Sequence, residues 1–202
     1  MAEKNGNNKV ITIVLAVIIT FAAIAVIYVN LPQETTKDDN TEEIYLTVVY
    51  EKEQLTYTLS ELEALEIITG MGGYRTSYPA IKGQGIYTGV PITTLVELSA
   101  RSITDYNITV HSDENGVKDN IEYTYDTVQG NLDIYNSTNA SDENPITIGG
   151  VTMIVCYAKD SEYLDESKDG KLKIAFITEN EELITKASLW WRYIYLIEII
   201  EE

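Results

Sequence analysis

A run of twenty residues without a charged side chain, residues 10–29, most constrains what this chain can form. A helix of this length rises ~30 Å, which matches the hydrocarbon core of a bilayer. We therefore expect a transmembrane helix. A cleaved signal peptide is the alternative, but its apolar core usually has ~7–15 residues and ends at a small-residue cleavage site. Here the longer run ends in "AVIYVN", which favours an uncleaved anchor.

Charged residues on either side of this run predict its orientation. Lys4 and Lys9 precede it, whereas residues 30–43 carry five acidic side chains against Lys37. The excess of positive charge on cytoplasmic segments places the N-terminus inside the cell. We expect a single-pass protein of the cell membrane with a cytoplasmic segment at 1–9, an anchor at 10–29, an acidic linker at 30–43 and an extracytoplasmic domain at 44–202.

The composition excludes several classes of function. A net charge of −18 repels nucleic acid and anionic lipid headgroups, so nucleic acid is not an expected partner. The acidity itself is explained by solubility or by a salty exterior. Cys156 and His111 are each the only residue of their type, so no internal disulfide and no metal-ligand spacing are expected. Cys156 stands in "VTMIVCY", which predicts a buried, inert thiol.

Two short helices are expected after the linker. In "TLSELEALEI", Thr58 and Glu61 have the spacing of a capping box, and Leu62 and Leu65 share one face. In "PITTLVELSA", the same periodicity predicts a helix with inward-facing leucines at positions 95 and 98.

The rest of the domain has the alternation of β-strands. "IYLTVVYEKEQLTYTL" predicts a hairpin, and "DENGVKDN" contains an Asn-Gly turn. "NITVHS", "IEYTYDTVQG", "TIGGVTMIVCYAKD" and "SKDGKLKIAFIT" predict further strands. "LWWRYIYLIEII" predicts a closing strand with Trp191, Tyr193, Tyr195 and Ile197 on one face. Six to eight strands with two or three helices indicate an α+β domain.

Five stretches, in this order, resemble one known family. They are "YTLSELEAL", "YTGVPITTLVELSA", "ITVHSDENGVKDNIEYTYDTV", "VTMIVCYAKDSEYLDESKDGKLKIAF" and "RYIYLIEI". Together they resemble the oxidoreductase molybdopterin-binding domain family, which has the sulfite oxidase fold. The likeness covers roughly residues 44–200. It implies a mixed β-sheet domain that holds molybdopterin where loops converge.

The likeness fails at one chemically important position. Catalytic members of the family provide a cysteine thiolate to molybdenum shortly after the first helix. The matching window here, "EIITGMGGYRTSY", contains Thr69, Met71 and Ser77 but no cysteine. A soft thiolate ligand has no simple replacement among neutral side chains. The chain therefore resembles a branch with a "GGY" element and without the thiolate, and molybdenum catalysis is not expected.

We expect the segment from Thr69 to Pro91, "TGMGGYRTSYPAIKGQGIYTGVP", to form a loop around a ligand. Its glycines allow backbone N–H groups to approach an anion, and the cations of this segment and the Trp190–Trp191 pair suit a pterin-like ring and phosphate. The expected ligand-binding residues are Gly72, Gly73, Tyr74, Arg75, Lys82 and Arg192. The alternative is structural: tight turns, tyrosines on the core and arginines paired with carboxylates.

Three functions remain open at this point. The favoured one is a non-catalytic extracytoplasmic domain that binds a pterin-like molecule or a protein partner. A molybdopterin-dependent oxidoreductase subunit is the second. The third is a structural cell-surface interaction domain. Three glycosylation sequons favour it, at Asn107, Asn136 and Asn139.

Overall fold

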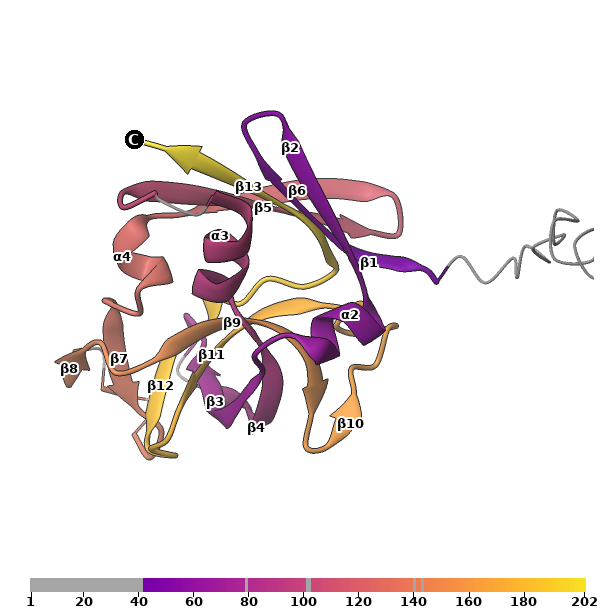
Figure 1. The fold of residues 1–202 in the computed structure, drawn as a ribbon. Helices are drawn as coiled ribbons and strands as arrows, with labels where there is room; N and C mark the ends of the chain where they lie inside the picture. Colours follow the sequence, from indigo (N-terminus) through magenta and orange to yellow (C-terminus); the bar gives the residue numbers. More distant parts are fainter. Residues whose placement is uncertain (1–41, 79, 101–102, 140, 143) are drawn as a thin grey trace, which may run out of the picture. The chain divides into compact units, whose positions relative to one another are not determined.

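The computed structural model describes residues 42–78, 80–100, 103–139, 141–142 and 144–202 (Figure 1). The expected anchor, residues 10–29, and nearly all of the acidic linker lie outside these residues. None of the helices that the structure describes is long and apolar enough to cross a membrane. Contacts divide the chain after Glu42, and every element below belongs to Glu43–Glu202.

The first sheet has five strands in the order β2-β1-β13-β5-β6. β1 and β13 run parallel, and the other neighbours are antiparallel. The predicted Asn-Gly turn joins β5 to β6, with positive φ at Asn115 and Gly116, as such a two-residue turn requires. The strands are β1 (Ile44–Tyr50), β2 (Glu53–Thr58), β5 (Tyr106–Glu114), β6 (Val117–Tyr123) and β13 (Ile194–Glu201).

The second sheet is built around a closed ring of four strands. β3 pairs with β4, β4 with β9, β9 with β11, and β11 with β3. The remaining strands, β12, β7 and β8 on one side and β10 on the other, extend this ring. The bounds are β3 (Ile68–Arg75), β4 (Ile81–Pro91), β7 (Asp133–Asn136), β8 (Thr147–Ile148), β9 (Thr152–Lys159), β10 (Glu162–Tyr163), β11 (Lys173–Thr178) and β12 (Leu183–Lys186).

Helix α2 (Leu59–Ala64) has the predicted capping box. The Thr58 hydroxyl accepts from the Glu61 N–H at 3.3 Å, and the Glu61 carboxylate accepts from the Thr58 N–H at 2.8 Å. These bonds satisfy two backbone N–H donors at the helix start. Leu62 is buried against the core, as its spacing predicted.

Helix α3 (Ile92–Ala100) lies between the two sheets and contacts strands of both (Figure 1). Leu95 faces inward as predicted, but the prediction for Leu98 is wrong, because its side chain is 44% exposed. The buried face continues from Leu95 through Ser99, one helical turn further on, and places Leu98 on the solvent side.

Helix α4 (Tyr125–Val128) corrects the strand predicted for "IEYTYDTVQG". The strand ends at Tyr123, because the Thr124 hydroxyl accepts from the Thr127 N–H and caps a helical turn. The described residues contain thirteen strands, more than the six to eight expected, because four of them, β7, β8, β10 and β12, are only two to four residues long.

The predicted ligand loop from Thr69 to Pro91 is instead the long antiparallel hairpin of β3 and β4. The glycines inside these strands permit close packing, since added Cβ atoms at Gly72 and Gly89 would overlap neighbouring atoms. Of the glycines in this hairpin only Gly83 has a positive φ. Glycine clusters therefore misled the prediction, because glycine marks both turns and close approaches of backbone.

The closing strand also differs from its prediction. A short 3-10 turn, η1 (Ala187–Leu189), and Tyr193 with φ of 57° interrupt the extended run, so β13 begins only at Ile194. A register shift between Ile194 and Leu196 changes the alternation again. The predicted face is therefore wrong, and the buried side chains of β13 are Ile194, Ile197 and Ile199.

The packing of β4 against β9 generates a test. A Cβ added at Gly89 would lie 2.1 Å from the Val155 carbonyl oxygen, so Gly89→Ala must displace backbone and should cost about 3 kcal/mol of unfolding free energy. Gly116→Ala, in the β5–β6 turn, meets no atom within 4 Å and should cost only about 1 kcal/mol through its positive φ. Urea denaturation measures both. Equal losses would contradict the packing described here.

Candidate functional site

Gly72 and Gly73 of the "GGY" element are buried in β3. A Cβ at Gly72 would lie 2.8 Å from Tyr87 Cδ2 and 3.0 Å from Trp190 Cη2. At Gly73 it would lie 3.1 Å from Ile184 Cγ2. Side chains therefore occupy the space beside both glycines, and Gly72 lets two aromatic rings pack directly on the β3 backbone.

Trp190 is the centre of an aromatic cluster above Gly72. Its ring centroid lies 5.2 Å from Tyr74, 5.1 Å from Tyr87 and 6.5 Å from Phe176. Tilted and edge-on rings at these distances attract each other through their quadrupoles. The indole Nε1–H donates to the buried Thr185 hydroxyl at 2.7 Å, which fixes the orientation of the Trp190 ring.

Lys173, which the sequence analysis did not single out, carries a buried cation in this cluster. Its side chain is 6% exposed, and its Nζ lies 2.7 Å from Asp169 Oδ1. The Nζ also lies 5.6 Å from the Tyr87 centroid and 5.5 Å from the Trp190 centroid. A lysine inside the apolar alternation of "KLKIAFIT" was the signal that could have identified it.

The cations of the β3–β4 hairpin lie toward another part of the second sheet. The Arg75 guanidinium is 5.5 Å from the Tyr135 ring of β7. Lys186 of β12 stands 5.6 Å from the same ring and 3.2 Å from an Asp133 carboxylate oxygen. Lys82 is exposed on β4, opposite Tyr74. The contacts of Arg75 thus involve β7, whereas those of Arg192 involve the loop before β11.

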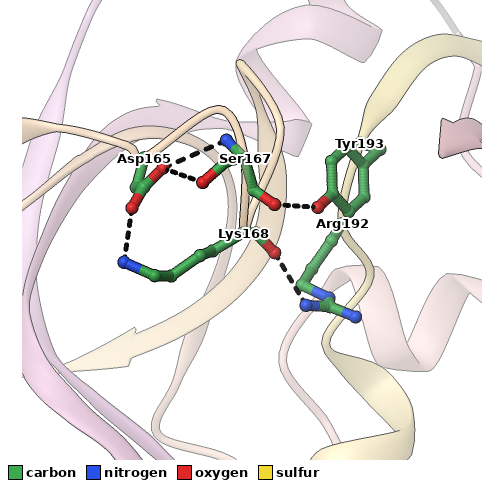
Figure 2. A network of polar contacts seen from close by, with 5 residues as sticks. All are labelled: Asp165, Ser167, Lys168, Arg192 and Tyr193. Atoms are coloured by element: carbon green, nitrogen blue, oxygen red, sulfur yellow. Dashed lines mark hydrogen bonds and ion pairs between the residues drawn. The ribbon is translucent and has the colours of Figure 1, made fainter. Parts of the chain in front are cut away.

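Arg192 and Tyr193 fasten the loop 165–170, as Figure 2 shows. The Arg192 guanidinium donates to the Lys168 carbonyl at 2.7 Å, and the Tyr193 hydroxyl donates to the Ser167 carbonyl at 2.8 Å. Hydrogen bonds from the Lys168 ammonium and from Ser167 lower the pKa of Asp165 to about 2. The loop therefore keeps its charged contacts throughout the physiological pH range.

A cavity of about 240 Å³ lies between residues 190–193 and the β5–β6 hairpin. Both tryptophans, one arginine and two carboxylates contribute to its lining. The buried Trp191 Nε1–H has no acceptor in the part of the chain that the structure describes. Arg192 is the one expected ligand residue that reaches it. The lining is Ser112, Glu114, Val117, Asp119, Trp190, Trp191, Arg192 and Tyr193.

The lone histidine lies elsewhere. His111 Nε2 is 2.8 Å from a Glu198 carboxylate oxygen, across the β5–β13 pair. It is therefore a cross-strand partner on the first sheet and does not line the cavity.

The sequons differ in their surroundings. The Asn107 amide lies in β5, where its oxygen accepts from the Tyr125 N–H at 3.2 Å. Asn136 ends β7, and Asn139 is exposed in the following loop. The Asn136 amide oxygen accepts from the Thr138 hydroxyl at 2.6 Å. Asn139 is thus the most accessible of the three acceptor positions.

The residues of this domain do not fit the molybdenum centre that the fold resemblance implies. The thiol of Cys156 is fully buried in β9 and lies 3.1 Å from the Ala158 carbonyl oxygen. Burial raises its pKa to about 12, so it offers no thiolate at neutral pH. Among the described residues no three His, Cys, Asp or Glu side chains form a group that could hold a metal ion.

Comparison with known proteins supports the fold alone. No family model matches the sequence, and no curated protein matches it. Among solved structures, the sulfane dehydrogenase SoxCD from Paracoccus pantotrophus is similar, with a TM-score of 0.52 and 10% sequence identity. The match covers 80% of this chain and 39% of that chain. It supports the distant fold relation that the sequence motifs predicted.

The burial of Cys156 predicts low reactivity. With a pKa of about 12, the thiol is protonated at pH 8, and only the thiolate reacts with iodoacetamide. Alkylation of the folded protein at pH 8 should be roughly a thousandfold slower than in urea, where the pKa returns to ~8.5. Mass spectrometry of timed samples measures both rates. Equal rates would contradict the burial of this thiol.

Proposed function

We propose that this chain is a single-pass membrane protein whose extracytoplasmic domain binds a small planar ligand, such as a pterin ring, without molybdenum chemistry. The ligand site is the cavity beside Trp190, Trp191 and Arg192. One observation carries the proposal: Trp190, Trp191 and Arg192 line one cavity with two carboxylates, and the buried Trp191 Nε1–H has no acceptor within the described residues.

An unsatisfied buried donor costs about 1–3 kcal/mol, which a ligand with a suitable acceptor recovers. The size of the cavity limits that ligand. At about 240 Å³ it falls just below the roughly 300–1,000 Å³ typical of ligand pockets. A ring system of one or two rings is therefore favoured over a complete nucleotide-linked cofactor.

The polar groups of the cavity complement a 2-amino-4-oxopteridine edge. The 2-amino group and its neighbouring ring N–H are donors, and Glu114 and Asp119 supply carboxylate acceptors. The 4-oxo group is an acceptor for the Trp191 indole N–H or the Arg192 guanidinium. The indole rings offer stacking surfaces to the flat ligand. A purely anionic ligand would instead face two carboxylates against one arginine.

The proposed location rests on the sequence of the N-terminal segment. Twenty uncharged residues follow Lys4 and Lys9 and precede an acidic segment. This order favours an anchor with the domain outside the cytoplasm. A cell-surface interaction domain is a related alternative, which the exposure of Asn139 in a sequon favours.

A molybdopterin-dependent oxidoreductase subunit is the alternative that the distant fold relation favours. Elemental mass spectrometry of protein purified from its own source discriminates the two, with pterin detection on the same sample. Pterin without molybdenum agrees with the binding domain. Stoichiometric molybdenum would replace that proposal with the enzyme.

Ligand binding can be tested with pterin and with lumazine, which has an oxygen in place of the 2-amino group. We expect titration calorimetry to detect pterin binding and weaker lumazine binding, because lumazine loses the donor to Glu114 or Asp119. Trp191→Phe should weaken pterin binding roughly tenfold, the loss expected for one hydrogen bond of about 1–1.5 kcal/mol. Lys52→Ala, an exposed β1–β2 turn change, is the control.

Two results would contradict this assignment. One is the absence of pterin binding to a folded protein at millimolar concentration. The other is pterin binding that Trp191→Phe leaves unchanged while a change at Arg75 or Lys82 abolishes it, which would move the site to the β3–β4 hairpin.

Topology can be tested with a membrane-impermeant maleimide, since the only native cysteine is buried. Ser77→Cys, in an exposed part of the domain, should be labelled on intact cells. Asn5→Cys should be labelled only after lysis. The reverse pattern would contradict the proposed orientation, and recovery of the labelled domain without detergent would indicate cleavage.

A further inference from the structure

The sheet edges of this domain are not equally protected. Edge strands expose unpaired backbone groups, and proteins usually protect them with short strands, bulges, proline or lysine. In the second sheet, the edge strands β8 and β10 each have two residues. In the first sheet, the edges are β2 and β6, with six and seven residues. The longer edges of the described fold are thus both in the first sheet.

β6 is the more regular of these two long edges. Its register with β5 runs without a shift from Ile108 opposite Tyr123 to Glu114 opposite Val117. The pairing of β2 with β1, in contrast, shifts between Ile44 and Leu46. β6 contains no proline, and its residues are exposed apart from Ile121 and Tyr123. Among the described strands only β5 pairs with it.

The backbone of β6 presents a donor away from β5. The Asn120 N–H donates to the carboxylate of its neighbour Asp119 at 2.8 Å. On the opposite side, the Asp119 carbonyl accepts from the Ser112 hydroxyl of β5 at 3.4 Å. Successive residues of a strand direct their backbone groups to alternate sides, which agrees with Asn120 facing outward. The Asp119 side chain thus occupies the position that the carbonyl of an added strand would take.

The charge around β6 determines which kind of segment could pair with this edge. Near its edge, the β5–β6 hairpin carries acidic side chains against Lys118, whose ammonium lies 5.9 Å from the Tyr195 ring. The chain as a whole has a net charge of −18. A second copy would bring like charges together, and like charges opposed across strands destabilise pairing. A basic segment is attracted instead. The acidic residues are Asp113, Glu114, Asp119 and Glu122.

We propose that β6 is a docking edge for an extended segment of another protein with Lys or Arg at alternate positions. The segment adds a sixth strand to the first sheet, and its carbonyl replaces the Asp119 carboxylate on the Asn120 N–H. The released carboxylate then pairs with a basic side chain of the segment. Backbone bonds provide affinity in such strand addition, and side chains provide specificity. This docking does not rest on the pterin ligand, because its affinity comes from the backbone edge of β6, but it shares the Asp119 carboxylate with the cavity.

The test uses an end-capped octapeptide of alternating Lys and Val, with a Glu-Val peptide as its control. Asn120→Pro removes the outward N–H, and Pro is tolerated at an edge position of this kind. Asn120→Ala keeps that N–H and is the matched control. We expect wild type and Asn120→Ala to bind the Lys-Val peptide, and Asn120→Pro to bind it roughly tenfold more weakly, as for one lost hydrogen bond.

Amide NMR shifts should map the peptide to β6, and binding should weaken as salt rises, because exposed charges are screened. Asp119→Lys provides a second variant that opposes the basic peptide without a proline, in case Asn120→Pro unfolds. Trp191→Phe should leave peptide binding intact, so failure of the pterin proposal is separable from failure of this one.

Four outcomes would overturn the proposal. They are no binding of the Lys-Val peptide at millimolar concentration, equal binding by Asn120→Pro and Asn120→Ala when both are folded, and shifts that map to another face. The fourth is a dimer through β6 in sedimentation analysis, which would make a second copy the occupant.

Discussion

The candidate site depends on the contacts that the buried Lys173 ammonium makes. An unpaired charge in this position would be costly to desolvate, and Asp169 together with the faces of Tyr87 and Trp190 compensates for it. Lys173 lies in β11, Tyr87 in β4, and Trp190 precedes β13. One cation therefore links both strands to the tryptophan that forms a wall of the cavity, and breaking its ion pair would disturb them together.

The same packing explains why the described residues do not fit a molybdenum centre held by a cysteine thiolate. The rings of Tyr87 and Trp190 occupy the space beside Gly72, and the only thiol, that of Cys156, is buried in β9. The polar groups that remain near a cavity are an indole N–H, a guanidinium and two carboxylates. Such a set suits recognition by hydrogen bonds and stacking. In general, a fold does not determine function, and the residues of a site do.

Structural features set by residues close in the chain were predicted well from the sequence, and features set by distant residues were not. The Thr58–Glu61 capping box, the Asn115–Gly116 turn and the burial of Cys156 each follow from residues close in the chain. The prediction of a loop at the β3–β4 hairpin is wrong because its glycines make room for rings and backbone that are far away in sequence. Arg192 lines the cavity beside Trp191, whereas Arg75 lies over the Tyr135 ring, and this difference follows from strand pairing between residues far apart in the chain.

The pairing of β1 with β13 has a consequence for how the domain folds. Thr47 stands opposite Leu196, and β13 lies between β1 and β5 in the sheet. β1, the first of the described strands, therefore has its parallel neighbour 149 residues further along the chain, from Thr47 to Leu196. Contacts of such high sequence separation slow folding, since a long loop must close before they form. During synthesis on the ribosome, β1 has no partner for its second edge until β13 has emerged. In this period the unpaired edge is exposed to aggregation, which chaperones prevent.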